Sequence, residues 1–369
     1  MQTMLAARLH SAGQPFQVDR IPVPTPGDDE VLIRVRACGV VPNLKNVIYH
    51  YPEWFPFLPL PRLPAIYGLD PAGEVVGVGR HAAGFPIGSR VYINPARSCG
   101  TCAKCRRGDT VSCSSFTFAG YFGFGPGSRE VLDRHSSGGF SEYLVAPVSS
   151  LVVLPDEITY EQAARFGYLG TAYAALRHAN AGSHTSVLIN GATGTVGVGA
   201  ILLALAMGAP KILAVARNEE LLAAVKALDP QRIVTHSTLH GPCTEWAKAQ
   251  THGFGPDVMI EALGPGAPAE ATLSAMQSVS RGGTIVTVGG MDDDIPINPI
   301  WIMCSQIRYQ GSAWFTTAQG EDMPMMVKAG TLDLSRFENQ VFGLEQVNEA
   351  LDAALHRNHG GFNNIVVVP

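Results

Sequence analysis

The chain has 369 residues, of which 46% are hydrophobic and 15% charged, and its formal net charge is -5. A chain of this length can bury a large core and suggests two domains or one large one. The acidic balance, with no run of five Lys or Arg residues, argues against nucleic acid or an anionic membrane surface as partner. The expected partner is therefore a small molecule.

The first twenty residues do not look like a secretion signal, because Arg8 and His10 interrupt the apolar segment and no small-residue cleavage site follows. We therefore expect a cytoplasmic protein in a reducing setting, where cysteines serve as metal ligands, reactive thiols or core residues rather than disulfides. The uncharged stretch 186–210 is interrupted by a glycine turn, which favours a buried strand, turn and helix over a membrane span.

The first part of the chain, up to about residue 155, contains short β-type runs separated by Gly and Pro, such as VLIRVRA, EVVGVG and SRVYIN. After about residue 160, strand-like and helix-like segments alternate, which predicts parallel βαβ units. The expected fold class is α/β: a mainly β domain over 1–160, a doubly wound parallel sheet over 161–312, and a tail over 313–369 that returns to the first domain.

A glycine turn follows the strand-like run SVLIN and precedes an apolar helix, which is the setting of a dinucleotide-binding turn. Gly194 would let the backbone approach the pyrophosphate, and Gly197 would let the helix pack against the strand. The helix N-terminus would offer free N–H groups to the phosphates. The alternative is a tight turn that binds nothing. The predicted cofactor contacts are Ala192, Thr193, Gly194, Thr195, Val196 and Gly197.

The second strand of this unit ends in Ala216, Arg217 and Asn218, with no acid before Glu219. NAD enzymes usually carry Asp or Glu here for the ribose 2′-hydroxyl, whereas a guanidinium can hold a 2′-phosphate through two hydrogen bonds. We therefore predict NADP(H) in preference to NAD(H), with these three residues in contact with the cofactor. The alternative is that Arg217 is a solvated charge that stacks on adenine.

Four cysteines follow the pattern CxxCxxCx7C at Cys99, Cys102, Cys105 and Cys113. Four thiolates suit tetrahedral Zn²⁺ and leave no open position for water or substrate, so the pattern predicts one structural zinc per chain. An iron–sulfur cluster is the alternative. The remaining cysteines, Cys38, Cys243 and Cys304, are interpreted as core or surface thiols.

Together these features resemble the medium-chain dehydrogenase/reductase superfamily, which includes the zinc alcohol dehydrogenases and quinone oxidoreductases. Segments such as GSRVYINPARSCGTCAKC, GGFSEYLVAP, DVMIEALG and GGTIVTVGG resemble family segments along nearly the whole chain. The resemblance implies a GroES-like catalytic domain, a Rossmann cofactor domain, a cleft between them, and a homodimer or homotetramer. It also implies cofactor contacts at Thr171, Leu263, Val288 and Gly289.

The chain departs from this family at the three ligands of the catalytic zinc. The resemblance places those positions at Val41, Leu69 and Gly167, none of which has a ligand atom in its side chain. Asn43 stands where the family has a proton-relaying hydroxyl, and Asp70 replaces the acid of a G-H-E segment. The YGLDPAGEVVG and A-x-G-x-x-G segments resemble the zinc-independent quinone and enoyl reductases. We therefore expect no catalytic zinc.

Without a metal to polarise a carbonyl, the substrate should already be activated, as in an enone, a quinone, an iminium or a carbonyl held by hydrogen-bond donors. The aromatic run YHYPEWFPF, with Tyr67 and Tyr168, is the expected pocket wall. A tyrosine hydroxyl, with an ordinary pKa of about 10, suits the acid role in reduction. The candidate catalytic residues are Asn43, His50, Tyr51, Asp70 and Tyr168.

Two other functions stay open from the sequence. One is an alcohol dehydrogenase that binds an active-site metal through Cys38, His50 and Asp70. The other is a cofactor-binding scaffold or sensor that no longer turns over substrate. Hydride transfer from NADPH and the number of zinc ions per chain distinguish these functions from a zinc-independent reductase.

Overall fold

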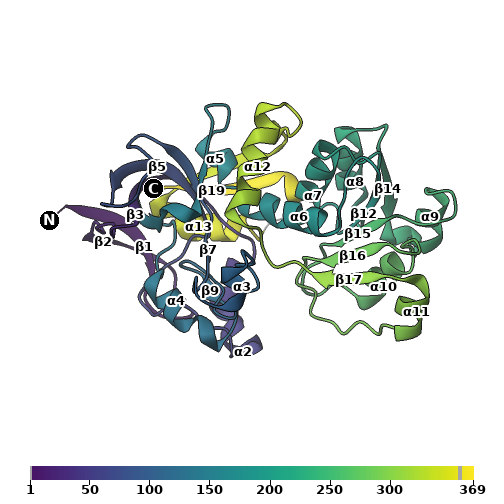
Figure 1. Ribbon diagram of the computed structural model, residues 1–369, viewed down its shortest axis with the longest axis horizontal. Helices are drawn as coiled ribbons and strands as arrows, with labels where there is room; N and C mark the ends of the chain where they lie inside the picture. Colours follow the sequence, from purple (N-terminus) through teal and green to yellow (C-terminus); the bar gives the residue numbers. More distant parts are fainter. Residues whose placement is uncertain (1, 356–359) are drawn as a thin grey trace.

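The computed structural model describes residues 2–355 and 360–369, and it has two bodies joined by helices (Figure 1). The mainly β body is on the left of the figure and the body with the parallel sheet is on the right, with helices α6 (Phe166–His178) and α12 (Thr317–Lys328) between them. No helix in the described ranges is both long and apolar enough to cross a membrane.

The mainly β body is built on a mixed sheet with the strand order β11-β6-β5-β3-β19-β18, and β10 also pairs with β3. Its strands are β3 (Glu30–Gly39), β5 (Asp70–Val78), β6 (Arg90–Ile93), β10 (Tyr143–Pro147), β11 (Leu151–Val153), β18 (Glu338–Gly343) and β19 (Asn363–Val368). Strands β18 and β19 belong to the C-terminal segment, so this segment completes a sheet that the N-terminal half begins.

Two small sheets flank this mixed sheet. One has the order β2-β1-β4 and the other β7-β8-β9. Their strands are β1 (Thr3–Leu9), β2 (Gln17–Pro22), β4 (Ala65–Ile66), β7 (Ala96–Arg97), β8 (Thr117–Phe118) and β9 (Phe122–Gly123). The helices of this body are α1 (Leu44–Tyr49), α2 (Tyr51–Trp54), α3 (Ala103–Arg106), α4 (Arg129–Arg134), α5 (Tyr160–Ala163) and α13 (Val347–Ala353).

The second body is a parallel sheet with the order β14-β13-β12-β15-β16-β17. Its strands are β12 (Ser186–Asn190), β13 (Lys211–Ala216), β14 (Ile233–Ser237), β15 (Val258–Glu261), β16 (Thr284–Thr287) and β17 (Arg308–Gly311). The central strands are apolar along their length because helices cover both faces of such a sheet. The helices are α7 (Thr195–Ala206), α8 (Glu219–Leu228), α9 (Thr244–Ala249), α10 (Ala269–Met276) and α11 (Pro299–Ser305). This arrangement is the expected doubly wound α/β class.

A buried arginine ties the two bodies together. Arg165 precedes α6 and donates to the backbone carbonyls of Asn363 at 3.0 Å, Gly361 at 2.6 Å and Thr195 at 3.3 Å. These carbonyls belong to the C-terminal segment and to the start of α7. One side chain, next to the start of α6, therefore connects the C-terminal segment with the start of α7.

Candidate functional site

The four cysteines of the loop 99–113 converge, with their sulfur atoms all within 4.8 Å of one another. The Sγ of Cys113 lies 3.8 Å from that of Cys102 and 3.6 Å from that of Cys99. Tetrahedral zinc with Zn–S bonds of about 2.3 Å requires sulfur atoms about 3.8 Å apart. The loop therefore has the donor chemistry and the spacing of a closed zinc site.

Backbone N–H groups also favour thiolates in this loop. The pKa of Cys99 is lowered to about 6, first by the backbone N–H groups of Thr101 and Cys102, and the pKa of Cys102 is lowered by the N–H of Cys105. Burial instead raises the pKa of Cys113 to about 12. A bound cation would stabilise that fourth thiolate, because metal binding and thiol deprotonation are coupled.

The glycine turn lies between β12 and α7, and Gly194 is the residue before the first turn of α7. Gly191 has a φ of +86°, and a Cβ on Gly197 would lie 2.2 Å from the carbonyl oxygen of Gly191. Both positions therefore require glycine, for turn geometry and for close helix–strand contact. Residues Thr193 to Val196 are half-buried, which leaves the N-terminus of α7 accessible to a phosphate group.

At the end of β13, Arg217 and Asn218 are exposed and Ala216 is buried. The side chain of Asn218 accepts a hydrogen bond from the backbone N–H of Leu221 at 2.9 Å and so caps α8. If Asn218 also contacts the cofactor, as predicted, the same side chain serves both as the helix cap and as that contact. Arg217 follows β13 at the same carboxyl edge of the sheet at which the glycine turn follows β12, and its contact with a 2′-phosphate stays a prediction.

The other predicted cofactor residues follow two neighbouring strands, β15 and β16. The backbone N–H groups of Val288 and Gly289 both donate to the carbonyl of Glu261 at 2.9 Å. A Cβ on Gly289 would lie 2.1 Å from the carbonyl oxygen of Leu263, so these loops are in direct contact. Thr171 lies in α6, where its hydroxyl donates to the carbonyl of Gly167 at 2.8 Å. The structure thus brings the first three residues together and places Thr171 on the connecting helix.

The position that the family resemblance gives to the third zinc ligand is packed against a carboxylate. A Cβ on Gly167 would lie 2.1 Å from Oδ1 of Asp70. Asp70 is 1% exposed and accepts a hydrogen bond from the hydroxyl of Tyr92 at 2.8 Å. Burial raises the pKa of Asp70 to about 7, opposed by the Tyr92 hydrogen bond and the charge of Arg165. The carboxyl group of Asp70 therefore occupies the space that a side chain at position 167 would need.

Asn43 and Tyr51, two of the predicted catalytic residues, are in contact. The Asn43 amide Nδ2 donates to the Tyr51 hydroxyl oxygen at 2.9 Å, and Asn46 donates to Oδ1 of Asn43 at 3.2 Å. The Tyr51 hydroxyl proton is then available for another acceptor. His50 lies apart from this pair: its exposed ring stacks on Trp54 with 4.8 Å between centroids.

Tyr168 lies in the first turn of α6 and is half-buried, and the Arg165 guanidinium lies 5.6 Å from its ring centroid. Sequence reasoning missed its neighbour Tyr121. The hydroxyl of Tyr121 is buried with no hydrogen-bond partner among the described residues. Burial raises its pKa, and its ring packs edge-on against that of Tyr67, with 6.4 Å between the centroids. The glycine- and aromatic-rich composition of residues 118–130 is the sequence signal that could have found this residue.

Comparison with known proteins identifies the family. Residues 27–156 match the family described as "Alcohol dehydrogenase GroES-like domain", and residues 195–329 match "Zinc-binding dehydrogenase". The chain is 32% identical, over 78% of its length and 78% of the relative, to an uncharacterized zinc-type alcohol dehydrogenase-like protein of Escherichia coli K12. The chain belongs to the medium-chain dehydrogenase/reductase superfamily. Its predicted membership and fold are confirmed, and it is an oxidoreductase.

Other members of the superfamily match nearly end to end. The sorbitol dehydrogenase of Bacillus subtilis is 27% identical over 96% of this chain and 94% of its own. The crystal structure of AibC superposes with a TM-score of 0.83 at 27% identity, covering all of this chain and 96% of the other. The scaffold of this medium-chain dehydrogenase/reductase is therefore that of the family throughout.

Proposed function

We propose that this protein is an NADP(H)-dependent oxidoreductase that transfers hydride to an activated C=O, C=C or C=N bond without a catalytic zinc. The observation that carries the proposal is the contact between Gly167 and Asp70. Together with the apolar side chains of Val41 and Leu69, it leaves the three positions of the usual ligand set without a donor atom.

The cofactor, when bound, supplies the hydride. The protein would hold its pyrophosphate at the turn around Gly194 and its adenosine phosphate at Arg217. An exposed guanidinium at the carboxyl end of β13, with no acid at the preceding positions, supports NADP(H) over NAD(H). The convergent sulfur atoms of the cysteine loop support one structural zinc per chain.

The chemistry then depends on hydrogen-bond donors that meet the negative charge developing on the substrate. Tyr51 is the leading donor. The Asn43 amide already donates to the Tyr51 hydroxyl oxygen, so the hydroxyl proton is free to be donated to the substrate. Asn43 positions Tyr51 rather than delivering a proton. Tyr168, half-buried in α6, is the second candidate donor, and Asp70 orients the hydroxyl of Tyr92.

The test measures NADPH oxidation and zinc content on the same purified sample. Enones, quinones, imines and unactivated aldehydes form the substrate panel. Turnover of an activated substrate with one zinc per chain is expected. Two zinc ions per chain would contradict the proposal and favour a second metal site, although among the described residues Cys38, His50 and Asp70 do not form a ligand group. Cofactor binding without hydride transfer to any member of the panel would instead favour a silent scaffold.

The role of Tyr51 is tested by Tyr51→Phe, which removes only the hydroxyl. Loss of a general acid lowers turnover by roughly 100-fold. Tyr49→Phe is the matched control, because Tyr49 lies two residues away with an exposed side chain. Equal turnover of Tyr51→Phe and the wild type would remove Tyr51 from the acid role, and Tyr168→Phe would then be tested in the same way.

Assembly and location are part of the same proposal. By its resemblance to the family, the protein would act on a small molecule in the cytoplasm as a homodimer or homotetramer. Size-exclusion chromatography with light scattering of the full chain measures the oligomer directly.

A further inference from the structure

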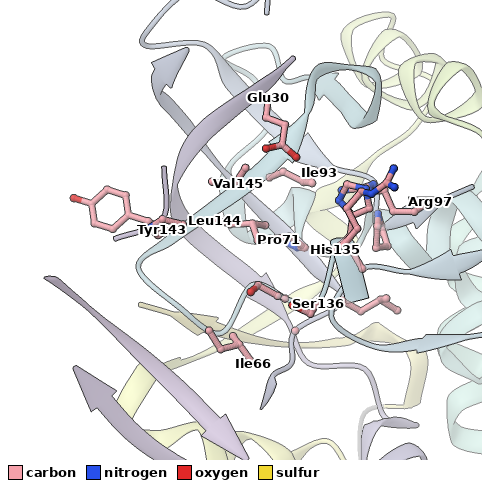
Figure 2. A pocket seen from close by; sticks show the side chains of 18 of the residues that line it. Glu30, Ile66, Pro71, Ile93, Arg97, His135, Ser136, Tyr143, Leu144 and Val145 are labelled. Atoms are coloured by element: carbon pink, nitrogen blue, oxygen red, sulfur yellow. The ribbon is translucent and has the colours of Figure 1, made fainter. Parts of the chain in front are cut away.

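A cavity of about 230 Å³ lies inside the catalytic domain, separate from the tyrosine cluster described above (Figure 2). Its walls come from the small sheet β2-β1-β4, from β5, β6 and β10, and from the segment after α4. About half of the cavity surface is apolar, with contributions from Met4, Ile21, Leu69, Pro71, Ile93 and Leu144. A space of this size is smaller than the roughly 300–1,000 Å³ of pockets for drug-sized molecules, so it fits a ligand with few non-hydrogen atoms.

The polar part of the wall centres on a buried guanidinium. Arg97, in β7, is 7% exposed, and its Nη1 donates to the carbonyls of Asn94 at 2.6 Å and Ala96 at 2.9 Å. Its Nε is buried and finds no hydrogen-bond partner within the described residues. A buried cation whose donors are not all used is costly unless an anion pairs with it.

Four other ionisable side chains line the same cavity: His135, Arg134, Glu30 and Tyr143. Figure 2 shows nitrogen atoms of Arg97 and His135 close together, with the Glu30 carboxyl group on another part of the wall. Burial and the charges of Arg97 and Arg134 lower the pKa of His135 to about 4, so it is neutral near pH 7 and can donate one hydrogen bond. The Glu30 carboxylate already accepts the backbone N–H of Gly27 at 2.9 Å.

We propose that this cavity binds a small organic monocarboxylate, with the carboxylate paired to Arg97 and the hydrocarbon part packed against Leu69, Pro71 and Leu144. A guanidinium can hold a carboxylate through two parallel hydrogen bonds. The apolar half of the wall favours a ligand with an alkyl or aryl body over a bare inorganic ion. The Glu30 carboxylate disfavours a second negative charge on the ligand.

The cavity lies on the opposite side of two strands from Asp70. Leu69 and Pro71 line the cavity, whereas Asp70 between them contacts Tyr92. Ile93 likewise lines the cavity, next to Tyr92 in β6. Neighbouring strand residues point to opposite faces, so Asp70 and Tyr92 face away from the cavity. Leu69 is common to both places, since it is also one of the three positions without a zinc-ligand atom, so the cavity adjoins that position.

Isothermal titration of the full-length protein with butyrate tests the proposal, with butyramide as the uncharged analogue and succinate and inorganic phosphate as dianionic comparisons. Butyrate is expected to bind at least about tenfold more tightly than each of these three, which corresponds to one charge-assisted contact. Equal binding of butyrate and butyramide, or tighter binding of phosphate, would overturn the monocarboxylate assignment.

Variants locate the binding site. Arg97→Gln and the cavity-filling Ile21→Trp should both abolish butyrate binding, whereas Arg20→Gln on exposed β2 should leave it unchanged. Because Ile21 is only half-buried, Ile21→Trp should fold even if Arg97→Gln does not, so the test can still be decided. Wild-type butyrate affinity in Ile21→Trp would show that the carboxylate binds elsewhere and would refute the proposal.

Discussion

The cysteine loop 99–113 and the surroundings of Asp70 are two places where the family resemblance leads one to look for a metal, and they have opposite chemistry. In the loop, four sulfur atoms lie within 4.8 Å of one another. Around Asp70, the expected ligand positions carry Val, Leu and Gly, and the carboxylate itself lies against the glycine. A scaffold can thus keep the geometry of a stabilising site while its reaction site changes chemistry.

The largest expected effect comes from breaking the loop with Cys102→Ser. Structural zinc binding is worth on the order of 10 kcal/mol, so losing one of four ligands should lower the free energy of unfolding by roughly 5 kcal/mol. Zinc content should fall from about one ion per chain to near zero. Cys304→Ser, at an exposed cysteine, is the control. If both variants retain zinc and stability equally, the loop is not the metal site.

Gly167→Cys tests the other side of the comparison by restoring a ligand-type side chain. The new Cβ would collide with Oδ1 of Asp70, so the variant should lose about 2 kcal/mol of stability and gain no second zinc ion. Gly125→Ala is the matched control, since an added Cβ there meets nothing within 4 Å. A stable Gly167→Cys protein with two zinc ions would show that the site is one substitution from a metal centre.

Asp70 should also make stability depend on pH. Its folded pKa of about 7 lies above the ordinary 3.8, so between these values the unfolded carboxyl loses its proton while the folded one keeps it. The free energy of unfolding should therefore fall as pH rises from about 4 to about 7, by up to about 1.4 kcal/mol per pH unit. Chemical denaturation across this range should show a weaker fall for Asp70→Asn. Parallel profiles would mean that Asp70 is ionised in the folded protein.

The smallest expected effect concerns cofactor choice. Arg217→Ala should reduce the preference for NADPH over NADH by about tenfold, because one charge-assisted contact to the 2′-phosphate is lost. Arg80→Ala, at an exposed arginine of the catalytic domain, should leave both affinities unchanged. A wild-type protein that binds NADH at least as tightly as NADPH would overturn the predicted role of Arg217.

The sequence could predict the features that depend on local spacing. The interval between the cysteines predicted a convergent loop, and the alternation of strands and helices predicted the parallel sheet. Gly197 is likewise explained by short-range geometry, since a Cβ there would meet the backbone of Gly191 and Ala192. Gly191 has a positive φ of +86°, which suits glycine in a turn, although the backbone that confines it belongs to Ala262 and Leu263.

The features that the sequence could not predict depend on residues far apart in the chain. Arg165 contacts the carbonyl of Asn363, and the ring of Tyr121 packs against that of Tyr67. These contacts are tertiary and leave no periodic pattern in the sequence. Asn218 differs, because the helix cap that it forms with the N–H of Leu221 is local.

The position of β19 has a consequence for how the molecule is assembled. β19 pairs Val366 and Val367 with Gly39 and Cys38 of β3, yet it follows the whole cofactor domain in the sequence. During synthesis that end of β3 stays an unpaired strand edge until the cofactor domain has emerged, and unpaired edges are sites of misassociation. Slow synthesis of the second half of the chain would therefore lengthen the time for which this edge of β3 is unpaired. The yield of folded protein should then depend on how soon β19 is made after β3.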